Sequence, residues 1–182
     1  EYRRQRQMCI RDRNIAVELL KRLLAERVSL FQKTNIVQAE KFSDLLNRSL
    51  SNYLKGLLTN EEVIQELLNL AKEISTTEAT GNNLGLTIEE KSFYDALTKS
   101  QAVQDIYTNE QLVAMTKELT DSLRKNRTID WQKKESARAG MRKMIKRLLK
   151  KYKYPPEEAA NALETVIRQC EHCLLYTSDA AD

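Results

Sequence analysis

Apolar residues recur at three- and four-residue spacing along most of the 182-residue chain, which is the period of an amphipathic helix. From Asn14, the segment IAVELLKRLLAERVSLF places its apolar residues along one broad stripe of such a helix. The same spacing predicts six further helices, over about 35–54, 60–74, 87–97, 109–126, 131–153 and 157–167. Seven helices with short links and no convincing strand pair indicate an all-α helical bundle without significant sheet.

Several expected helix ends carry recognisable signals. The segments 87–90 (TIEE) and 108–111 (TNEQ) fit the capping box, in which two side chains satisfy free backbone N–H groups of the first turn. Thr59 or Asn60 is expected to cap the third helix. The small polar residues of 75–85 predict an exposed loop between the third and fourth helices.

Charge is concentrated in the segment RTIDWQKKESARAGMRKMIKRLLKKYKY at 127–154. It contains eleven Lys and Arg residues and two acids, a net charge of +9 against +4 for the whole chain, so the remainder sums to −5. Its apolar residues fall on one helix face: Ala137, Met141, Met144, Ile145, Leu148 and Tyr152. The opposite face is basic and carries Arg142, Lys143, Lys146, Arg147 and Lys150.

Particular residues are expected to start and stop this basic helix. Asp130 is expected to be the N-cap, because its carboxylate would lie near the free N–H groups of the first turn. Trp131 is expected to be a core anchor at the helix start. Proline disfavours helical geometry in the residue before it, so the helix should stop at 154–156. The expected structural anchors are Asp130, Trp131, Tyr152, Tyr154, Pro155 and Pro156.

The basic face has two interpretations. It is either the solvated side of a core helix or a patch for phosphates or an acidic partner surface. Binding to DNA there would be electrostatic, salt-dependent and independent of sequence, because nothing at this spacing indicates base recognition. The candidate DNA- or partner-binding residues are Lys134, Arg138, Arg142, Lys143, Lys146, Arg147, Lys150 and Lys151.

No motif for catalysis is found. The chain has neither a phosphate-binding G-x-x-x-x-G-K-[ST] loop nor a G-x-G-x-x-G loop. Glu89-Glu90-Lys91 is like half of a metal-dependent nuclease site, but it is better explained by helix capping. We therefore expect no catalytic residue and no cofactor in this piece.

The segment 170–173 (CEHC) has the C-x-x-C spacing of redox or metal sites, but a second pair of ligands is missing, so we expect no metal. No apolar run is long enough to span a membrane, and a cytoplasmic location is the default. MCIRDR at 8–13 and CLLYTSDAAD at 173–182 resemble translated sequencing-adapter DNA. We expect 1–13 and 173–182 to be foreign to the protein and 14–172 to be a single helical domain; ordinary termini are the alternative.

Several segments together resemble the C-terminal helical region of the restriction (R) subunit of type I restriction enzymes. They are AVELLKRLLAE at 16–26, NIVQAEKFSDLL at 35–46, FYDAL at 93–97, LRKNRTIDW at 123–131, ESARAGMRKMIKRLLKKYKYPP at 135–156 and ETVIRQ at 164–169. The resemblance covers nearly all of 14–171. Lys153 departs from the family pattern, which more often has glycine between the two tyrosines.

The resemblance implies a non-catalytic domain of an ATP-driven DNA translocase and endonuclease. In that family the nuclease and motor domains precede this region, and ATP and Mg²⁺ are expected for those domains alone. The helical region is thought to attach the motor to the modification and specificity subunits, and its basic helix would face those subunits or the DNA backbone. The alternative is a free-standing helical nucleic-acid-binding module that uses the basic helix at 133–153.

Overall fold

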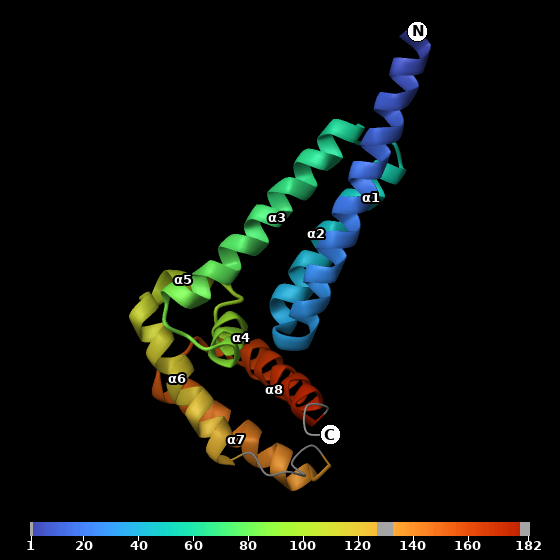
Figure 1. Cartoon of the computed structure of the whole chain (residues 1–182). Helices are drawn as coiled ribbons and strands as arrows, with labels where there is room; N and C mark the ends of the chain where they lie inside the picture. The colour runs from blue at the N-terminus through green and yellow to red at the C-terminus, as the bar shows by residue number, and fades with distance from the viewer. Residues whose placement is uncertain (1, 127–132, 179–182) are drawn as a thin grey trace. The chain divides into compact units, whose positions relative to one another are not determined.

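The computed structural model describes the backbone of residues 2–126 and 133–178 and the side chains of 14–126 and 133–173. Every regular element in these ranges is an α-helix (Figure 1), which confirms the predicted all-α fold. The helices are α1 (Tyr2–Thr34), α2 (Ile36–Leu54), α3 (Asn60–Asn83), α4 (Ile88–Leu97), α5 (Gln101–Ile106), α6 (Asn109–Asn126), α7 (Glu135–Lys151) and α8 (Pro156–Ser178). The described ranges thus hold eight helices, one more than expected. The additional helix is α5, which has six residues and only one buried apolar side chain, Val103.

The chain divides into two compact units. Unit 1 comprises residues 1–32 and 38–80, and unit 2 comprises 33–37 and 81–182. The sequence predicts a single helical domain over 14–172, and the structure distributes that range over the two units. The expectation that 1–13 and 173–182 are foreign to the protein stays a prediction.

Unit 1 is held together by apolar side chains from α1, α2 and α3. Phe42 of α2 and Val63 and Leu67 of α3 are fully buried. The ring of Phe31 lies 5.4 Å from that of Phe42 and is tilted by 55°, a favourable arrangement for two aromatic rings. The other buried members of this cluster are Val17, Leu24, Val28, Leu46, Leu70 and Ile74.

The prediction of an exposed loop at 75–85 is wrong, because α3 continues through Asn83. Small hydroxyl residues favour loops when they compete for backbone groups, but in a helix they can bond the carbonyl four residues earlier. Thr76, Thr77 and Thr80 donate in this way to the carbonyls of residues 72, 73 and 76 at 2.8–2.9 Å. The hydroxyls are therefore satisfied inside the helix.

The predicted starts of α3, α4 and α6 are confirmed. Thr87 and Glu90 form a capping box at the start of α4. The same reciprocal bonds join Thr108 with Gln111 before α6. Thr59, rather than Asn60, caps α3, where its backbone N–H donates to Glu62 at 2.7 Å.

Unit 2 has its own core between four helices. Helix α4 packs against α6 and α8, and α7 also packs against α6 and α8. The side chains at the centre are fully buried: Phe93, Leu97, Leu112, Met115, Leu119, Ile145, Leu149 and Val166. The core face of α7 therefore lies where the sequence pattern placed it, with Met141, Ile145 and Leu148 buried.

Three hydrogen bonds of buried side chains fix the segment 33–37, where α1 ends and α2 begins, inside unit 2. The Gln169 side chain of α8 accepts a hydrogen bond from the Ile36 backbone N–H at 3.0 Å and donates one to the Thr34 carbonyl at 2.8 Å. Asn35 donates to Asp95 of α4 at 2.7 Å. These side chains satisfy polar groups that would be costly to bury unpaired.

Candidate binding surfaces on α7 and α1

From Arg142 to Lys150, every exposed side chain of α7 is a cation. At 100° per residue, five cations fall within about 140° of arc, opposite the buried apolar residues. They are Arg142, Lys143, Lys146, Arg147 and Lys150, and all five are exposed. Within the described residues, no ion pair involves any of the five. We call these five residues the basic face.

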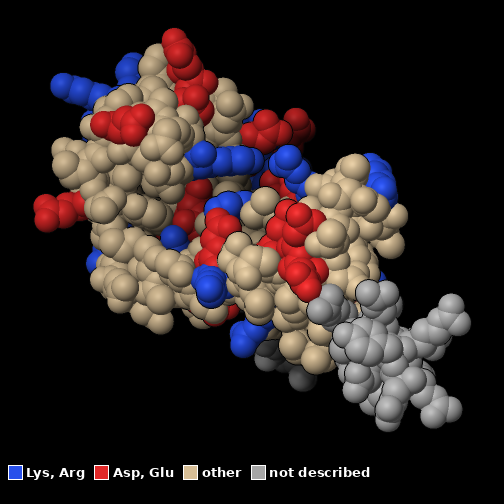
Figure 2. All heavy atoms as spheres, turned by 90° about the horizontal axis from the view of Figure 1, so that it is seen from above, with Lys and Arg blue, Asp and Glu red and all other residues tan. Residues whose placement is uncertain are grey.

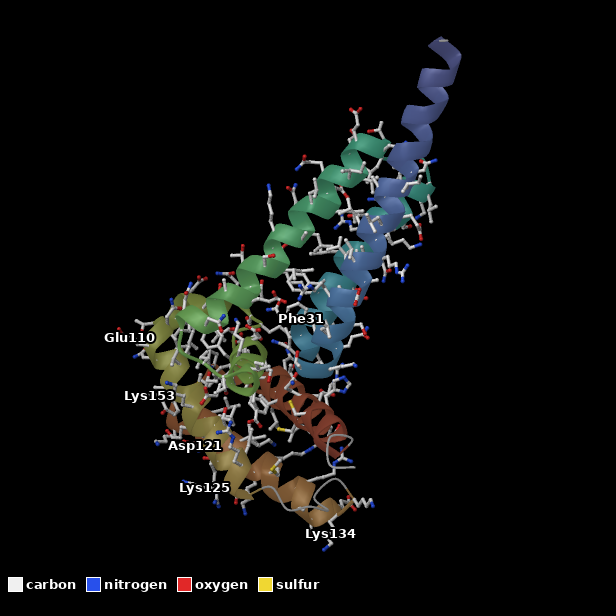
Figure 3. The ribbon with its side chains drawn as sticks, viewed as in Figure 1. Phe31, Glu110, Asp121, Lys125, Lys134 and Lys153 are labelled. Atoms are coloured by element: carbon white, nitrogen blue, oxygen red, sulfur yellow. The ribbon has the colours of Figure 1, made fainter. Side chains whose placement is uncertain are left out.

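The basic face occupies the C-terminal half of α7, about 12 Å along the helix axis from Arg142 to Lys150. A helix of 17 residues is about 25 Å long. Lys134, just before α7, and Lys153, just after it, lie at opposite ends of the helix (Figure 3). Both are exposed; Lys153 follows the basic face, whereas the first two turns of α7 separate Lys134 from it.

Two of the eight predicted binding residues are engaged inside unit 2 instead. Arg138 is half-buried and pairs with Glu171 of α8 at 2.6 Å. Lys151 pairs with Glu118 of α6, also at 2.6 Å. The acids on α6 and α8 that meet these cations could not be assigned from sequence, because only the packing of the helices brings them to α7.

Glu118 also accepts a hydrogen bond from the Tyr152 hydroxyl at 2.5 Å. The hydrogen bonds from Lys151 and Tyr152 hold the pKa of Glu118 below its ordinary value. The same contact with Glu118 raises the pKa of Lys151. Lys151 therefore stays charged and is tied to α6.

The start of α7 differs from the prediction. The helix begins at Glu135, and its N-cap is Lys134, which makes no side-chain cap hydrogen bond. Asp130 is therefore not the N-cap of this helix, and Asp130 and Trp131 lie outside the described residues. Glu135 places an acidic side chain in the first turn of α7. A negative charge there interacts favourably with the positive end of the helix dipole.

The tyrosines and prolines after α7 lie where they can hold its end. Tyr154 is buried, and its hydroxyl donates to the Leu97 carbonyl at 2.6 Å. Its ring stacks on that of Tyr107 with centroids 6.3 Å apart, and the Tyr107 hydroxyl donates to the Tyr152 carbonyl at 2.9 Å. Pro156 is the first residue of α8, a position that tolerates proline because its missing N–H would have no helical partner.

Positive and negative charges are mixed on another part of the surface. On the face drawn in Figure 2, acidic and basic side chains are interspersed with uncharged surface. Pairs such as Lys41 with Glu73 and Lys91 with Asp95 join opposite charges at 2.6 and 2.7 Å. The basic face differs from the face drawn in Figure 2 in carrying charge of a single sign.

A second surface is apolar and lies on α1. Ile15, Leu19, Leu23 and Leu30 are 58, 56, 50 and 50% exposed. At 100° per residue they fall within about 80° of arc, on the side away from the buried Val17, Leu24 and Val28. The sequence groups all of these residues into one broad stripe, whereas the structure divides them into a core face and an exposed face. We call the four exposed residues the apolar stripe.

The segment Glu89-Glu90-Lys91, which is like half of a nuclease site, lies in the first turn of α4. Glu90 belongs to the capping box of α4, Glu89 pairs with Arg124 at 2.7 Å, and Lys91 pairs with Asp95, so the capping interpretation of these residues holds. In the part of the chain that the structure describes, no three His, Cys, Asp or Glu side chains are grouped as metal ligands would be. None of the described helices is long and apolar enough to cross a membrane.

Most of the chain is similar to known proteins. A family model described as type I restriction enzyme HindI endonuclease subunit-like, C-terminal, matches residues 4–174. The type I restriction enzyme HindI endonuclease subunit of Haemophilus influenzae is 38% identical over 159 residues, which are 87% of this chain and 15% of that protein. No solved structure matches significantly.

A second relative is archaeal. The proposed type I restriction enzyme MjaIXP endonuclease subunit of Methanocaldococcus jannaschii is 30% identical over 135 residues, which are 74% of this chain and 13% of that protein. The chain thus spans about one seventh of the length of these relatives. Because the family model covers most of the chain, the resemblance read from its motifs is confirmed: the chain belongs to the family of type I restriction endonuclease subunits and corresponds to their C-terminal helical part.

Proposed function

We propose that this chain is a non-catalytic helical part of a type I restriction endonuclease subunit that attaches the subunit to its modification and specificity partners and binds the DNA backbone. The observation that carries the DNA contact is the basic face of α7. Its five exposed cations have no acidic partner among the described residues. In the whole enzyme, ATP and Mg²⁺ would serve the nuclease and motor domains of the subunit.

The composition of the basic face favours DNA over a protein partner. Protein–protein interfaces are depleted of Lys at their centre and enriched in aromatic and apolar anchors. Interfaces with DNA are more polar and far more positive. The basic face contains three Lys and two Arg, and the apolar residues of α7 are directed into the core of unit 2 instead.

The apolar stripe of α1 is the better candidate for subunit docking. Soluble proteins seldom leave several large apolar side chains exposed together, and such patches often mark protein contacts. Burying a large aliphatic side chain stabilises a complex by about 1.5–3 kcal/mol, so four half-exposed ones could contribute several kcal/mol. We therefore assign docking to the apolar stripe and DNA binding to the basic face.

Two variants of the 182-residue chain separate these roles. Arg142, Lys146 and Lys150 are changed together to Glu, which takes the formal net charge from +4 to −2. Leu19 and Leu23 are changed together to Ser. DNA binding is measured by fluorescence anisotropy with a labelled 25-base-pair duplex of random sequence, and docking by co-purification with the modification and specificity subunits of the same source.

We expect the charge-reversal variant to lose DNA binding and keep docking, and the Ser variant to do the reverse. The matched control is reversal of Lys55, Lys72 and Lys117, which are also exposed and give the same net charge of −2. The control should retain most of the DNA affinity. Loss of docking without loss of DNA binding in the charge-reversal variant would instead make the basic face a protein interface.

A further inference from the structure

Among the described residues, three helices end with the same hydrogen-bond pattern, but one of them has an unusual residue at its turning point. After α2, the N–H groups of Gly56 and Leu57 bond the carbonyls of Tyr53 and Asn52 at 3.0 and 2.9 Å. This is the Schellman motif, whose turning residue adopts a left-handed conformation and is usually glycine. Gly56 fits this rule with a φ of 74°.

The motif recurs after α3 and α7. Gly85 has a φ of 62° and closes α3 with the corresponding bonds. After α7, the N–H groups of Lys153 and Tyr154 bond the carbonyls of Lys150 and Leu149 at 3.0 and 2.9 Å. The turning residue there is Lys153, with a φ of 57°, and it is the one non-glycine residue of the described chain with a positive φ.

A side chain at this position is unfavourable, because in a left-handed conformation its Cβ approaches the following carbonyl oxygen. The neighbours nevertheless fix the turn. Tyr154 is buried, stacks on Tyr107 and donates its hydroxyl to Leu97, so the backbone of Lys153 cannot relax without disturbing the core of unit 2. Residues held in such conformations occur preferentially at functional sites.

Lys153 adds one more exposed cation next to the basic face. Lys153 is exposed, and its backbone N–H bonds the carbonyl of Lys150, the last member of the basic face. Lys151 is closer to Lys150 in the sequence than Lys153 is, but it forms an ion pair with Glu118. We propose that Lys153 binds a phosphate of the DNA backbone together with Lys150, and that this contact offsets the strain of its left-handed backbone.

This inference rests on the proposed function and names a further contact residue of the same site. It is tested by Lys153→Gly in the 182-residue chain, because the substitution removes the strain and the cation together. Lys153→Arg keeps both, and Lys72→Gln removes an exposed cation from α3 as a matched control. Thermal unfolding is followed by circular dichroism, and binding to the random duplex is titrated at several NaCl concentrations.

We expect opposite effects of Lys153→Gly on the two measurements. The midpoint temperature should rise by about 2–4 °C. The dissociation constant for DNA should rise about three- to tenfold at low salt, and the slope of log K against log [NaCl] should become shallower by about 0.9, as for one lost phosphate contact. Lys153→Arg and Lys72→Gln should resemble the parent chain in affinity, within about twofold.

The inference is overturned if Lys153→Gly binds DNA as tightly as the parent, or if it lowers the midpoint temperature. In the first case the DNA contact of the basic face still stands, provided that the triple reversal of Arg142, Lys146 and Lys150 abolishes binding. If the parent chain does not bind the duplex at all, both the inference and the proposed DNA contact fail.

Discussion

The side chain of Gln169 accepts a hydrogen bond from the backbone N–H of Ile36 at 3.0 Å, although the two residues are 133 positions apart. Ile36 is the first residue of α2, so its N–H has no partner within that helix. Gln169 is fully buried in unit 2. The side-chain amide of Gln169 thus accepts the hydrogen bond of an N–H group at the start of α2 that no residue of α2 can accept.

Replacement of Gln169 by Leu should therefore destabilise the chain strongly. The volume is similar, but the Ile36 N–H and the Thr34 carbonyl lose their side-chain partner. We expect a loss of about 2–3 kcal/mol in the free energy of unfolding, measured in urea, because leaving a buried polar group unpaired costs about 1–3 kcal/mol. Gln65→Leu on the exposed side of α3 should change it by less than about 0.5 kcal/mol. Equal effects of the two substitutions would contradict the assigned role of Gln169.

The Tyr154 hydroxyl should give a measurable dependence on alkaline pH. Burial raises the pKa of Tyr154, with smaller contributions from the charge of Glu158 and from Tyr107. The folded state holds the phenolic proton more tightly than the unfolded state, so its contribution is complete below the ordinary tyrosine pKa of about 10 and is lost as the pH rises above it.

Tyr154→Phe should accordingly lower the free energy of unfolding by about 1–2 kcal/mol at pH 7, because the bond to the Leu97 carbonyl is lost. It should also reduce the decline in stability between about pH 10 and 11. Urea unfolding at pH 7, 9, 10 and 11 measures both effects. An unchanged alkaline decline would show that Tyr154 is not the group responsible.

The ion pair of Glu118 with Lys151 of α7 should make the stability of the chain depend on acidic pH. Its pKa is lowered by the hydrogen bonds from Lys151 and Tyr152, so its contribution to stability is present above the ordinary Glu pKa and is lost as the pH falls through the lowered value. In Glu118→Gln, the midpoint temperature should fall less between pH 6 and pH 3 than in the parent chain.

The same substitution should strengthen DNA binding. Lys151 loses its carboxylate partner and becomes available beside Lys150, so the affinity for the random duplex should rise about two- to fivefold at low salt. Glu62→Gln is a suitable control, because it also removes one exposed carboxylate but lies in the first turn of α3. An equal gain in both variants would indicate an effect of net charge alone.

Replacing Gly140 or Gly85 by alanine should change the free energy of unfolding in opposite directions. Gly140 lies inside α7, is exposed, and a Cβ there would meet no atom within 4 Å, so Gly140→Ala should stabilise the chain by about 0.5–1 kcal/mol. Gly85 has a φ of 62°, so Gly85→Ala should destabilise it by about 1–2 kcal/mol. Chemical denaturation of both variants checks the signs.

The helices and the core side of α7 could be predicted because their spacing is a property of single segments. Capping signals such as Thr87 with Glu90 are equally local, and the structure confirms them. The sequence predicts a loop at 75–85 because small hydroxyl residues suit both loops and helices. The hydrogen bonds of their hydroxyls to carbonyls four residues earlier favour the helix instead.

The binding surfaces could be predicted only in part, because they depend on contacts between helices. The row of cations on α7 follows from helical geometry alone. That Arg138 and Lys151 are engaged by Glu171 and Glu118 depends on the packing of α7 against α8 and α6. The exposure of Leu19 beside the half-buried Leu20 and the buried Leu24 likewise depends on which side of α1 meets the rest of unit 1.

The most direct test of the basic face is the salt dependence of DNA binding by the unmodified 182-residue chain. We expect log K for the random duplex to fall linearly with log [NaCl] between 50 and 200 mM, with a slope of about −4 to −5 for five phosphate contacts. Reversal of Arg142, Lys146 and Lys150 should remove most of that slope. Absence of binding at 50 mM NaCl, or a slope that survives the reversal, would contradict the assignment of DNA binding to α7.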